Sequence, residues 1–158
     1  MKIREATEND ASGIAAVVHA MKQLQSVAPA SAATTAERIE GNLRQAKSTG
    51  SSTIYVAETP DQALAGYCAV HWVPFLFLAG GEAYVTELFV CPADSGRGLG
   101  SRLLESVVQE ARRRGCSRVS LLNGRDGESY GRGFYAKRGW VERASMANFI
   151  FPLAENSR

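Results

Sequence analysis

The chain has 158 residues, of which 45% are hydrophobic and 22% are charged, which is typical of a single globular domain spanning residues 1–158. Its net charge of +2 is too small to indicate a nucleic-acid-binding protein. The charge is unevenly divided, because residues 1–90 carry net −3 and residues 91–158 carry net +5. Three cysteines without paired spacing exclude a disulfide framework or a zinc site, so a reduced, cytoplasmic setting fits.

The first third predicts a short strand and two helices. Lys2–Glu5 forms the strand, and Thr7 is a candidate N-cap for a helix whose apolar face runs from Ile14 to Leu24. Thr34 or Thr35 caps the second helix, which ends near Gly50. The charged N-terminus lacks the apolar region of a signal peptide, so no export is expected.

A hairpin and an apolar loop follow. Thr53–Glu58 and Ala63–Trp72 are the predicted strands. The loop Pro74–Gly81 contains four consecutive apolar residues, a run too short to span a bilayer, so no membrane contact is expected. The simplest interpretation is that these side chains pack in the core or lengthen a strand. The functional alternatives are a subunit contact, as in a homodimer, or a wall of an acceptor site.

The central stretch predicts a strand, a glycine-rich turn and a helix. Val85–Val90 is the strand, which Pro92 ends because proline cannot donate to a sheet ladder. The apolar face of the helix starts at Leu99, and Gly115 is the expected C′ residue.

The turn between this strand and this helix is suited to binding an anion. Glycines allow backbone amides to approach a ligand closely, and a helix N-terminus adds unpaired donors and a positive dipole. The glycines at 96, 98 and 100 do not match the dinucleotide spacing, and the lysine of a P-loop is missing. A phosphate or pyrophosphate is therefore the expected guest.

The C-terminal part predicts a strand, a helix and a closing hairpin. Ser117–Leu122 is the strand, and Glu128–Arg138 is a helix weakened by two glycines. Trp140–Arg143 and Met146–Leu153 are the expected hairpin strands, followed by a frayed tail.

Two segments resemble the GNAT superfamily of N-acetyltransferases. Ser95–Gly100 is similar to the acyl-CoA pyrophosphate loop of the family, and Val90-Cys-Pro92 is similar to the stretch before it. Phe134–Trp140 is similar to the downstream segment of the family. The resemblance implies an α/β (α+β) fold: a mixed, mostly antiparallel sheet of about six to seven strands flanked by about four helices.

The resemblance also implies an acetyl-CoA site and no metal. An amide near Val90 would polarise the thioester, Arg97 would contact phosphate, and Arg102 is expected to be merely exposed. Ser95 stands where the family usually has Gln or Arg, and Glu128 where it often has Asn, so these two contacts are expected to differ. The implied acetyl-CoA-binding residues are Leu88, Phe89, Val90, Ser95, Gly96, Arg97, Gly98, Leu99, Gly100, Ser101, Glu128 and Tyr135.

Glu87 and Tyr135 are the candidate catalytic residues. Glu87 lies among apolar neighbours, where burial without a partner would disfavour its charged form and suit it to accept a proton. The alternatives are a surface or ion-paired Glu87, or one that only binds a cationic substrate. By strand alternation, Tyr84 and Thr86 should lie on the opposite face. The family resemblance implies that Tyr135 is the general acid, whereas Tyr130 is expected to pack with Phe134.

The function implied is acetyl-CoA-dependent N-acetyl transfer to a primary amine on a small cationic molecule, by direct attack in a ternary complex. Cys91 adjoins the loop, but no cysteine is placed as an acyl carrier. The alternative acceptors are a protein N-terminus or lysine. A non-catalytic acyl-CoA sensor is an alternative of a different class. Acylation of an RNA-linked amine is a weaker one, because nucleic acid is not expected as a partner.

Overall fold

The computed structural model describes residues 1–24, 31–77 and 79–153. It divides into two compact units, residues 1–122 and 123–158. We call them the first and second units and describe each by itself.

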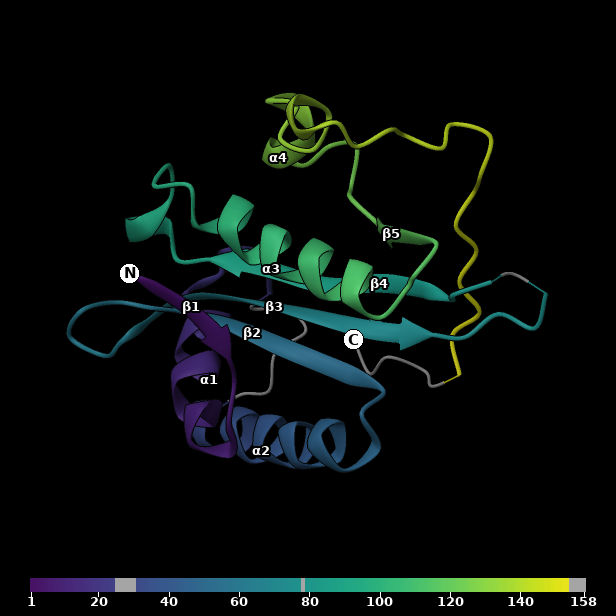
Figure 1. Ribbon diagram of the computed structural model, residues 1–158. Helices are drawn as coiled ribbons and strands as arrows, with labels where there is room; N and C mark the ends of the chain where they lie inside the picture. Colours follow the sequence, from purple (N-terminus) through teal and green to yellow (C-terminus); the bar gives the residue numbers. More distant parts are fainter. Residues whose placement is uncertain (25–30, 78, 154–158) are drawn as a thin grey trace. The chain divides into compact units, whose positions relative to one another are not determined.

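The first unit is built on a mixed sheet of five strands (Figure 1). In chain order the strands are β1 (Lys2–Glu5), β2 (Ser52–Glu58), β3 (Leu64–Val73), β4 (Glu82–Val90) and β5 (Arg118–Leu121). The strands from β1 to β4 pair antiparallel with their neighbours, and β5 pairs parallel with β4. The prediction of a mixed, mostly antiparallel sheet is therefore confirmed, with five strands rather than six or seven.

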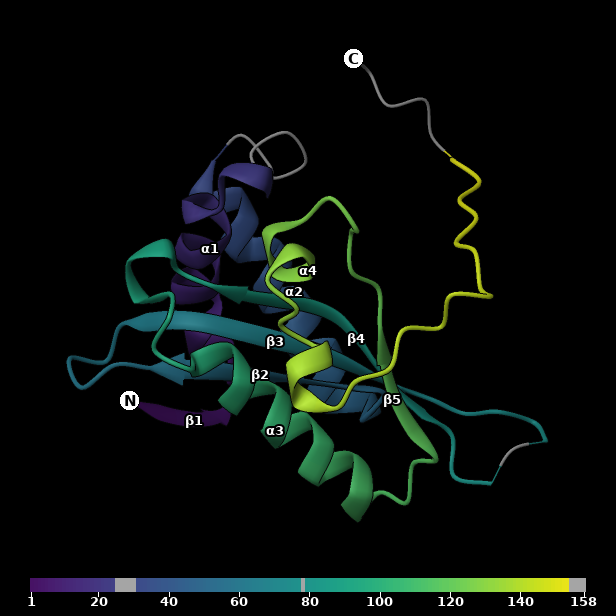
Figure 2. The same cartoon turned by 90° about the horizontal axis from the view of Figure 1, so that it is seen from above.

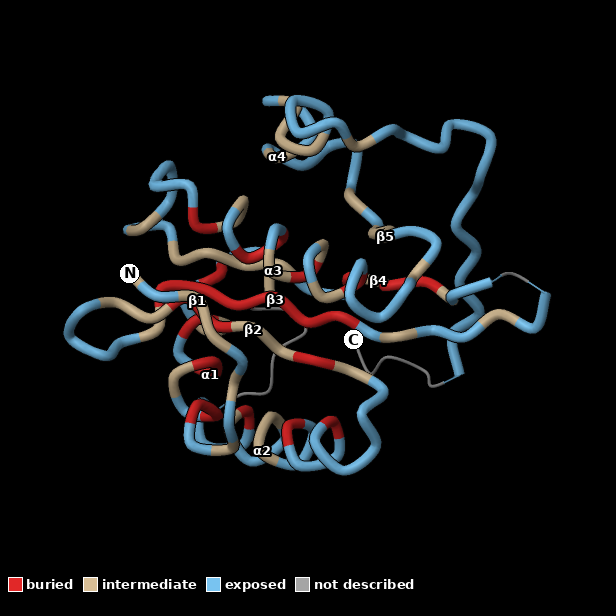
Figure 3. Tube along the Cα trace, in the orientation of Figure 1, coloured by how far each residue is buried: buried red, intermediate tan, exposed pale blue. Residues whose placement is uncertain are grey.

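Three helices cover the two faces of this sheet. The helices α1 (Ala11–Ala20) and α2 (Ala32–Thr49) lie on one face, and α3 (Leu99–Arg113) lies on the other. Figure 2 shows the strands from the side that α3 covers. The core forms where these helices meet the sheet, and Figure 3 shows buried residues along β3, β4 and the inner helix faces. The most deeply buried side chains are Leu99, Leu103, Val17, Val56, Val70, Val107 and Cys68.

Helix boundaries follow local capping groups. The N-cap of α2 is Ser31, whose hydroxyl accepts from the Thr34 amide at 3.1 Å, so the predicted caps Thr34 and Thr35 lie inside the helix. Gly50 ends α2 at φ 64°, as expected for a C-terminal glycine. Thr7 precedes a short 3₁₀ turn rather than α1 itself, because its amide donates to the Asp10 carboxylate at 2.7 Å.

Strand β4 contains a β-bulge. Glu87 pairs with Ala69, and Val85 pairs with Val70, so Thr86 is an extra residue without a partner on β3. Tyr84 pairs with His71, which lies two residues along β3 from Ala69, the partner of Glu87. Residues two apart on a strand point to the same face of the sheet. Tyr84 and Glu87 therefore lie on the same face, and the prediction from simple alternation was wrong for Tyr84.

The apolar loop between β3 and β4 does not pack as core. Leu76 and Phe77 are exposed, and the ring of Phe75 packs edge-on against Phe77 and lies under the Arg118 guanidinium. The interpretation as buried residues was wrong for Leu76 and Phe77. Leu78 lies outside the described residues.

The described part of the second unit, residues 123–153, contains only short helical turns. Helix α4 spans Glu128–Gly131, and a 3₁₀ turn spans Ala136–Arg138. The single helix predicted over Glu128–Arg138 was wrong, because the backbone leaves helical geometry at Gly133, whose φ is 63°. The closing hairpin was also wrong, since residues 140–153 form no strand and the large apolar side chains of residues 141–153 are exposed.

Within the described residues, we find no helix with the length and apolar character needed to cross a membrane.

Candidate active site

A cavity of about 440 Å³ lies in the first unit, bounded by α1, α2 and residues of β2, β3 and β4. On the strands, Ile54, Ala69 and Glu87 are register partners across β2, β3 and β4, and all three line it. Tyr67 and His71 extend this row along β3. A volume of this size suits a small molecule.

The helix wall of the cavity is mixed, because apolar side chains of both helices line it beside polar side chains of α2. Arg38, Asn42 and Gln45 lie at i, i+4 and i+7 along α2, which places them on one face of the helix. Ile14 and Val18 of α1 supply an apolar portion. An apolar body with a few convergent polar groups is the usual character of a ligand-binding site.

A hydrogen bond between Tyr67 and Glu87 is the main polar contact described in this cavity. The Tyr67 hydroxyl donates to Oε2 of Glu87 at 2.6 Å. Burial, reinforced by the charge of Glu87 and this bond, raises the pKa of Tyr67, so the phenol stays protonated at neutral pH and can only donate to the carboxylate. Tyr67 thereby fixes one carboxylate oxygen of Glu87.

The sequence did not reveal Tyr67. It lies on β3, twenty residues before Glu87, and only the antiparallel register of β3 with β4 brings the two side chains together. The local signal, an aromatic residue within an apolar strand, equally describes a core side chain. The structure also corrects the expectation for Glu87, which is exposed rather than buried, so its carboxylate is accessible from the cavity.

The glycine loop has the backbone conformation that an anion site requires. Gly96 and Gly98 have φ values of 79° and 78°, and Gly98 is the N-cap of α3, with no side chain capping the helix. The first amides of a helix have no intrahelical acceptor, so those of α3 are suited to phosphate oxygens. Residues 95–98 are exposed and Leu99 anchors the helix in the core.

Strand β4 has an open edge beside this loop. Strand β5 pairs with β4 only from Glu82 to Val85, while β4 continues to Val90. Residues 87–90, which include the predicted Leu88, Phe89 and Val90, therefore have a strand partner only on the β3 side within the described residues of this unit, and Thr86 has no register partner on either side. An extended ligand could lie along such an edge as an added strand.

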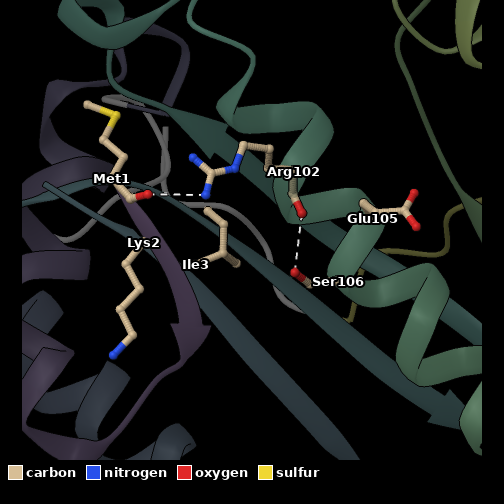
Figure 4. A pocket seen from close by; sticks show the side chains of 6 residues that line it. All are labelled: Met1, Lys2, Ile3, Arg102, Glu105 and Ser106. Atoms are coloured by element: carbon tan, nitrogen blue, oxygen red, sulfur yellow. Dashed lines mark hydrogen bonds between the residues drawn. The ribbon is translucent and has the colours of Figure 1, made fainter.

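The two arginines of the loop region make local contacts. Arg97 donates to the Asp94 carboxylate at 2.7 Å, three residues earlier. Arg102 donates to the Met1 carbonyl at 3.1 Å beside a shallow hollow lined by Lys2, Ile3 and Glu105 (Figure 4). Arg102 is exposed, as predicted.

The remaining two predicted residues, Glu128 and Tyr135, belong to the second unit. The Glu128 side chain is 91% exposed and pairs with Arg132 at 3.7 Å. The half-buried Tyr135 packs edge-on against Phe134 and Trp140, with ring centroids 4.9 and 5.9 Å away. This packing restricts the ring of Tyr135.

Tyr130 differs from its prediction as a packing residue. It is 39% exposed, and its hydroxyl donates to Glu142 at 2.9 Å. This hydrogen bond raises the pKa of Tyr130. The carboxylate of Glu142 also accepts from Arg125, so Tyr130 is part of a surface network.

The cysteine thiols are in environments that disfavour the thiolate. Burial raises the pKa of Cys68 to about 12, and burial also raises that of Cys91. Because the thiolate is the nucleophile, neither side chain is activated for covalent chemistry. Among the described residues there is no group of three or more His, Cys, Asp or Glu side chains placed to hold a metal ion.

Known proteins share both the sequence pattern and the fold. The profile described as "Acetyltransferase (GNAT) family" matches residues 18–140. Glucosamine 6-phosphate N-acetyltransferase 1 of Oryza sativa subsp. japonica is 36% identical over 77 residues, which are 49% of this chain and 44% of that protein. A probable glucosamine 6-phosphate N-acetyltransferase 2 from the same organism is 36% identical over 102 residues, covering 62% and 59%. The chain thus matches about half of the length of these relatives.

A solved structure agrees with the fold over nearly the whole chain. The crystal structure of a transcriptional regulator from Bacillus halodurans C-125 has a TM-score of 0.80 at 21% identity, with 95% of this chain and 99% of that chain covered. This likeness concerns the fold alone. The resemblance seen in the two sequence segments is confirmed by the family profile, which covers most of the chain: the chain belongs to the acetyltransferase (GNAT) family.

Proposed function

We propose that this protein is an acetyl-CoA-dependent N-acetyltransferase that acts on a primary amine of a small molecule. The observation that carries the proposal is the Tyr67–Glu87 pair in the cavity under α1 and α2. It offers a carboxylate that is both accessible and held in one orientation, which is what a general base needs.

The residues of the first unit fit acetyl-CoA as co-substrate. The exposed glycine loop and the N-terminus of α3 would hold its pyrophosphate, with the positive φ of Gly96 and Gly98 turning amides toward it. The open edge of β4 over residues 86–90 would hold its extended arm through backbone hydrogen bonds. Bound there, it supplies the thioester that is cleaved.

Glu87 would activate the acceptor. An aliphatic ammonium group has a pKa of about 10.4, so most of the amine is protonated and cannot attack at neutral pH. With Oε2 of Glu87 occupied by the Tyr67 hydroxyl, Oε1 is the oxygen available to take that proton, directly or through a water molecule. The neutral nitrogen then forms a bond to the acetyl carbon while the carbon–sulfur bond breaks.

Tyr135 would protonate the departing sulfur. The thiolate leaves with the electron pair of the broken bond, and the phenol can give it a proton. The nitrogen loses a further proton as the amide forms, and a proton returns to the Tyr135 phenolate through solvent. Packing of the ring between Phe134 and Trp140 supports this role, because it limits the orientations of the hydroxyl. The protein N-terminus or lysine remains the alternative acceptor class.

The test is release of free CoA thiol from acetyl-CoA with a pooled panel of small amines, beside a control without amine. The proposal predicts release that depends on one pool, with an equal amount of acetylated product found by mass spectrometry. No amine-dependent release from any pool, with acetyl-CoA binding intact, would contradict the small-molecule enzyme. That result would favour a macromolecular acceptor or a non-catalytic sensor.

A further inference from the structure

The charges that line the cavity are balanced rather than acidic. Its lining contains one carboxylate, Glu87, and one guanidinium, Arg38. A polyamine or another molecule with several cationic groups would need several acceptors, and the described residues that line the cavity offer only one carboxylate. The negative net charge of residues 1–90 therefore does not describe this cavity.

Arg38 is available to a ligand. No carboxylate among the described residues forms an ion pair with it, although α2 carries Glu37 and Glu40 nearby. By contrast, Arg44 on the same helix is engaged by Glu8 and Glu40 at 3.1 and 2.7 Å, and it does not line the cavity. The helix thus holds one arginine in a surface network and leaves another facing the cavity.

The polar face of α2 extends the contact that Arg38 could make. Seven residues separate Arg38 from Gln45, which corresponds to about 10 Å along a helix axis. The side-chain amides of Asn42 and Gln45 can donate and accept hydrogen bonds, which suits hydroxyl groups of a ligand bound beside Arg38.

We propose that the acceptor is a primary amine that also carries an anionic group, with the amine at Glu87 and the anion at Arg38. An arginine binds carboxylate or phosphate with paired hydrogen bonds, so one residue can select this class. The proposal rests on the proposed function, because it names the substrate class of the same cavity. It replaces a polycationic acceptor with one that carries one cationic and one anionic group, as the cavity lining has one guanidinium and one carboxylate among its described residues.

A matched pair of acceptors tests the class. Glucosamine and glucosamine 6-phosphate differ only in the phosphate, and spermidine represents a polycation. A charge-assisted hydrogen bond contributes enough for the phosphate to raise kcat/KM by about tenfold to a hundredfold. Equal values for the pair, or a preference for spermidine, would overturn the inference while leaving the acetyltransferase itself established.

The variant Arg38→Gln tests the residue. It should lower kcat/KM for glucosamine 6-phosphate by about tenfold or more, mainly by raising KM, with a much smaller loss for glucosamine. The matched control is Arg44→Gln on the same helix, which should change neither value by more than about twofold. Equal losses for both acceptors in Arg38→Gln would contradict an anion-reading role. Failure of every amine to be acetylated would instead overturn the proposed function and this inference with it.

Discussion

The two units of this chain differ in what fixes their side chains. The first unit has a five-stranded sheet and a buried core, and its candidate base is placed by strand register and a hydrogen bond of 2.6 Å. In the second unit, no described residue is buried, and the candidate acid is held by two neighbouring aromatic rings.

The proposed catalytic roles are divided between these units. In the proposed reaction, binding and activation of the amine would depend on the first unit, where strand register places Glu87 beside Tyr67. Protonation of the leaving group would depend on Tyr135, whose support is a small aromatic cluster. Kinetic measurements should therefore distinguish substitutions in the first unit, which would affect the amine, from substitutions in the second unit, which would affect the leaving group.

The largest expected effect is that of Glu87→Gln in the first unit. The substitution keeps the size of the side chain but removes the proton acceptor, so kcat/KM should fall about a hundredfold to ten-thousandfold at neutral pH. Steady-state kinetics and a separate acetyl-CoA binding titration would measure it. Activity should recover partly as the pH rises, because more amine is then unprotonated. Activity equal to that of the unmodified protein would exclude Glu87 as the base.

The matching change in the second unit is Tyr135→Phe. It keeps the ring that packs on Phe134 and Trp140 but removes the hydroxyl, so turnover should fall about a hundredfold with little change in acetyl-CoA affinity. Measuring kcat and the dissociation constant of acetyl-CoA would separate the effect on turnover from the effect on affinity. Unchanged turnover would remove the acid role of Tyr135.

The stability of the first unit should depend on pH through Asp10. The hydrogen bonds from Arg4, at 2.8 Å, hold the pKa of Asp10 below its usual range. This stabilisation is present above the unfolded pKa of about 3.9 and is lost as the pH falls through the lower folded value. Asp10→Asn should lower the free energy of unfolding by about 2 kcal/mol at pH 7. Chemical denaturation would measure this, and the difference should shrink below about pH 4. A difference independent of pH would contradict the assignment.

A smaller effect is expected for Tyr67→Phe. Loss of the hydroxyl frees Oε2 of Glu87, so kcat/KM should fall about tenfold through poorer orientation. Steady-state kinetics would measure the loss, and an unchanged kcat/KM would contradict the orienting role of the Tyr67 hydroxyl.

The smallest effect is expected for Cys91→Ala. Burial keeps this thiol protonated, and direct transfer does not require it, so activity should stay within about twofold. A loss of several orders of magnitude in the same thiol-release assay would instead indicate a covalent acetyl carrier.

Local sequence signals were enough to predict the glycine loop and helix α3. Pro92 and Gly115 bound the glycine loop and α3 as expected, because each acts through its own backbone. The loop glycines, with positive φ at Gly96 and Gly98, were likewise visible in the sequence. The two segments 95–100 and 134–140 were sufficient to indicate the family.

Features that depend on pairing were not predictable. The bulge at Thr86 and the contact of Tyr67 with Glu87 arise from strand register, which no single segment determines. The polar face of α2 became a cavity wall only through its packing above the sheet. Residues 140–153 were predicted to form a closing hairpin, but a strand also needs a partner, and the described structure pairs none with them.

Initial-rate kinetics with both substrates varied tests the central claim most directly. Direct transfer, with the amine and acetyl-CoA bound together, predicts intersecting lines in double-reciprocal plots and no acetylated protein when the amine is omitted. Parallel lines, together with an acetylated protein detected by mass spectrometry before amine is added, would contradict it.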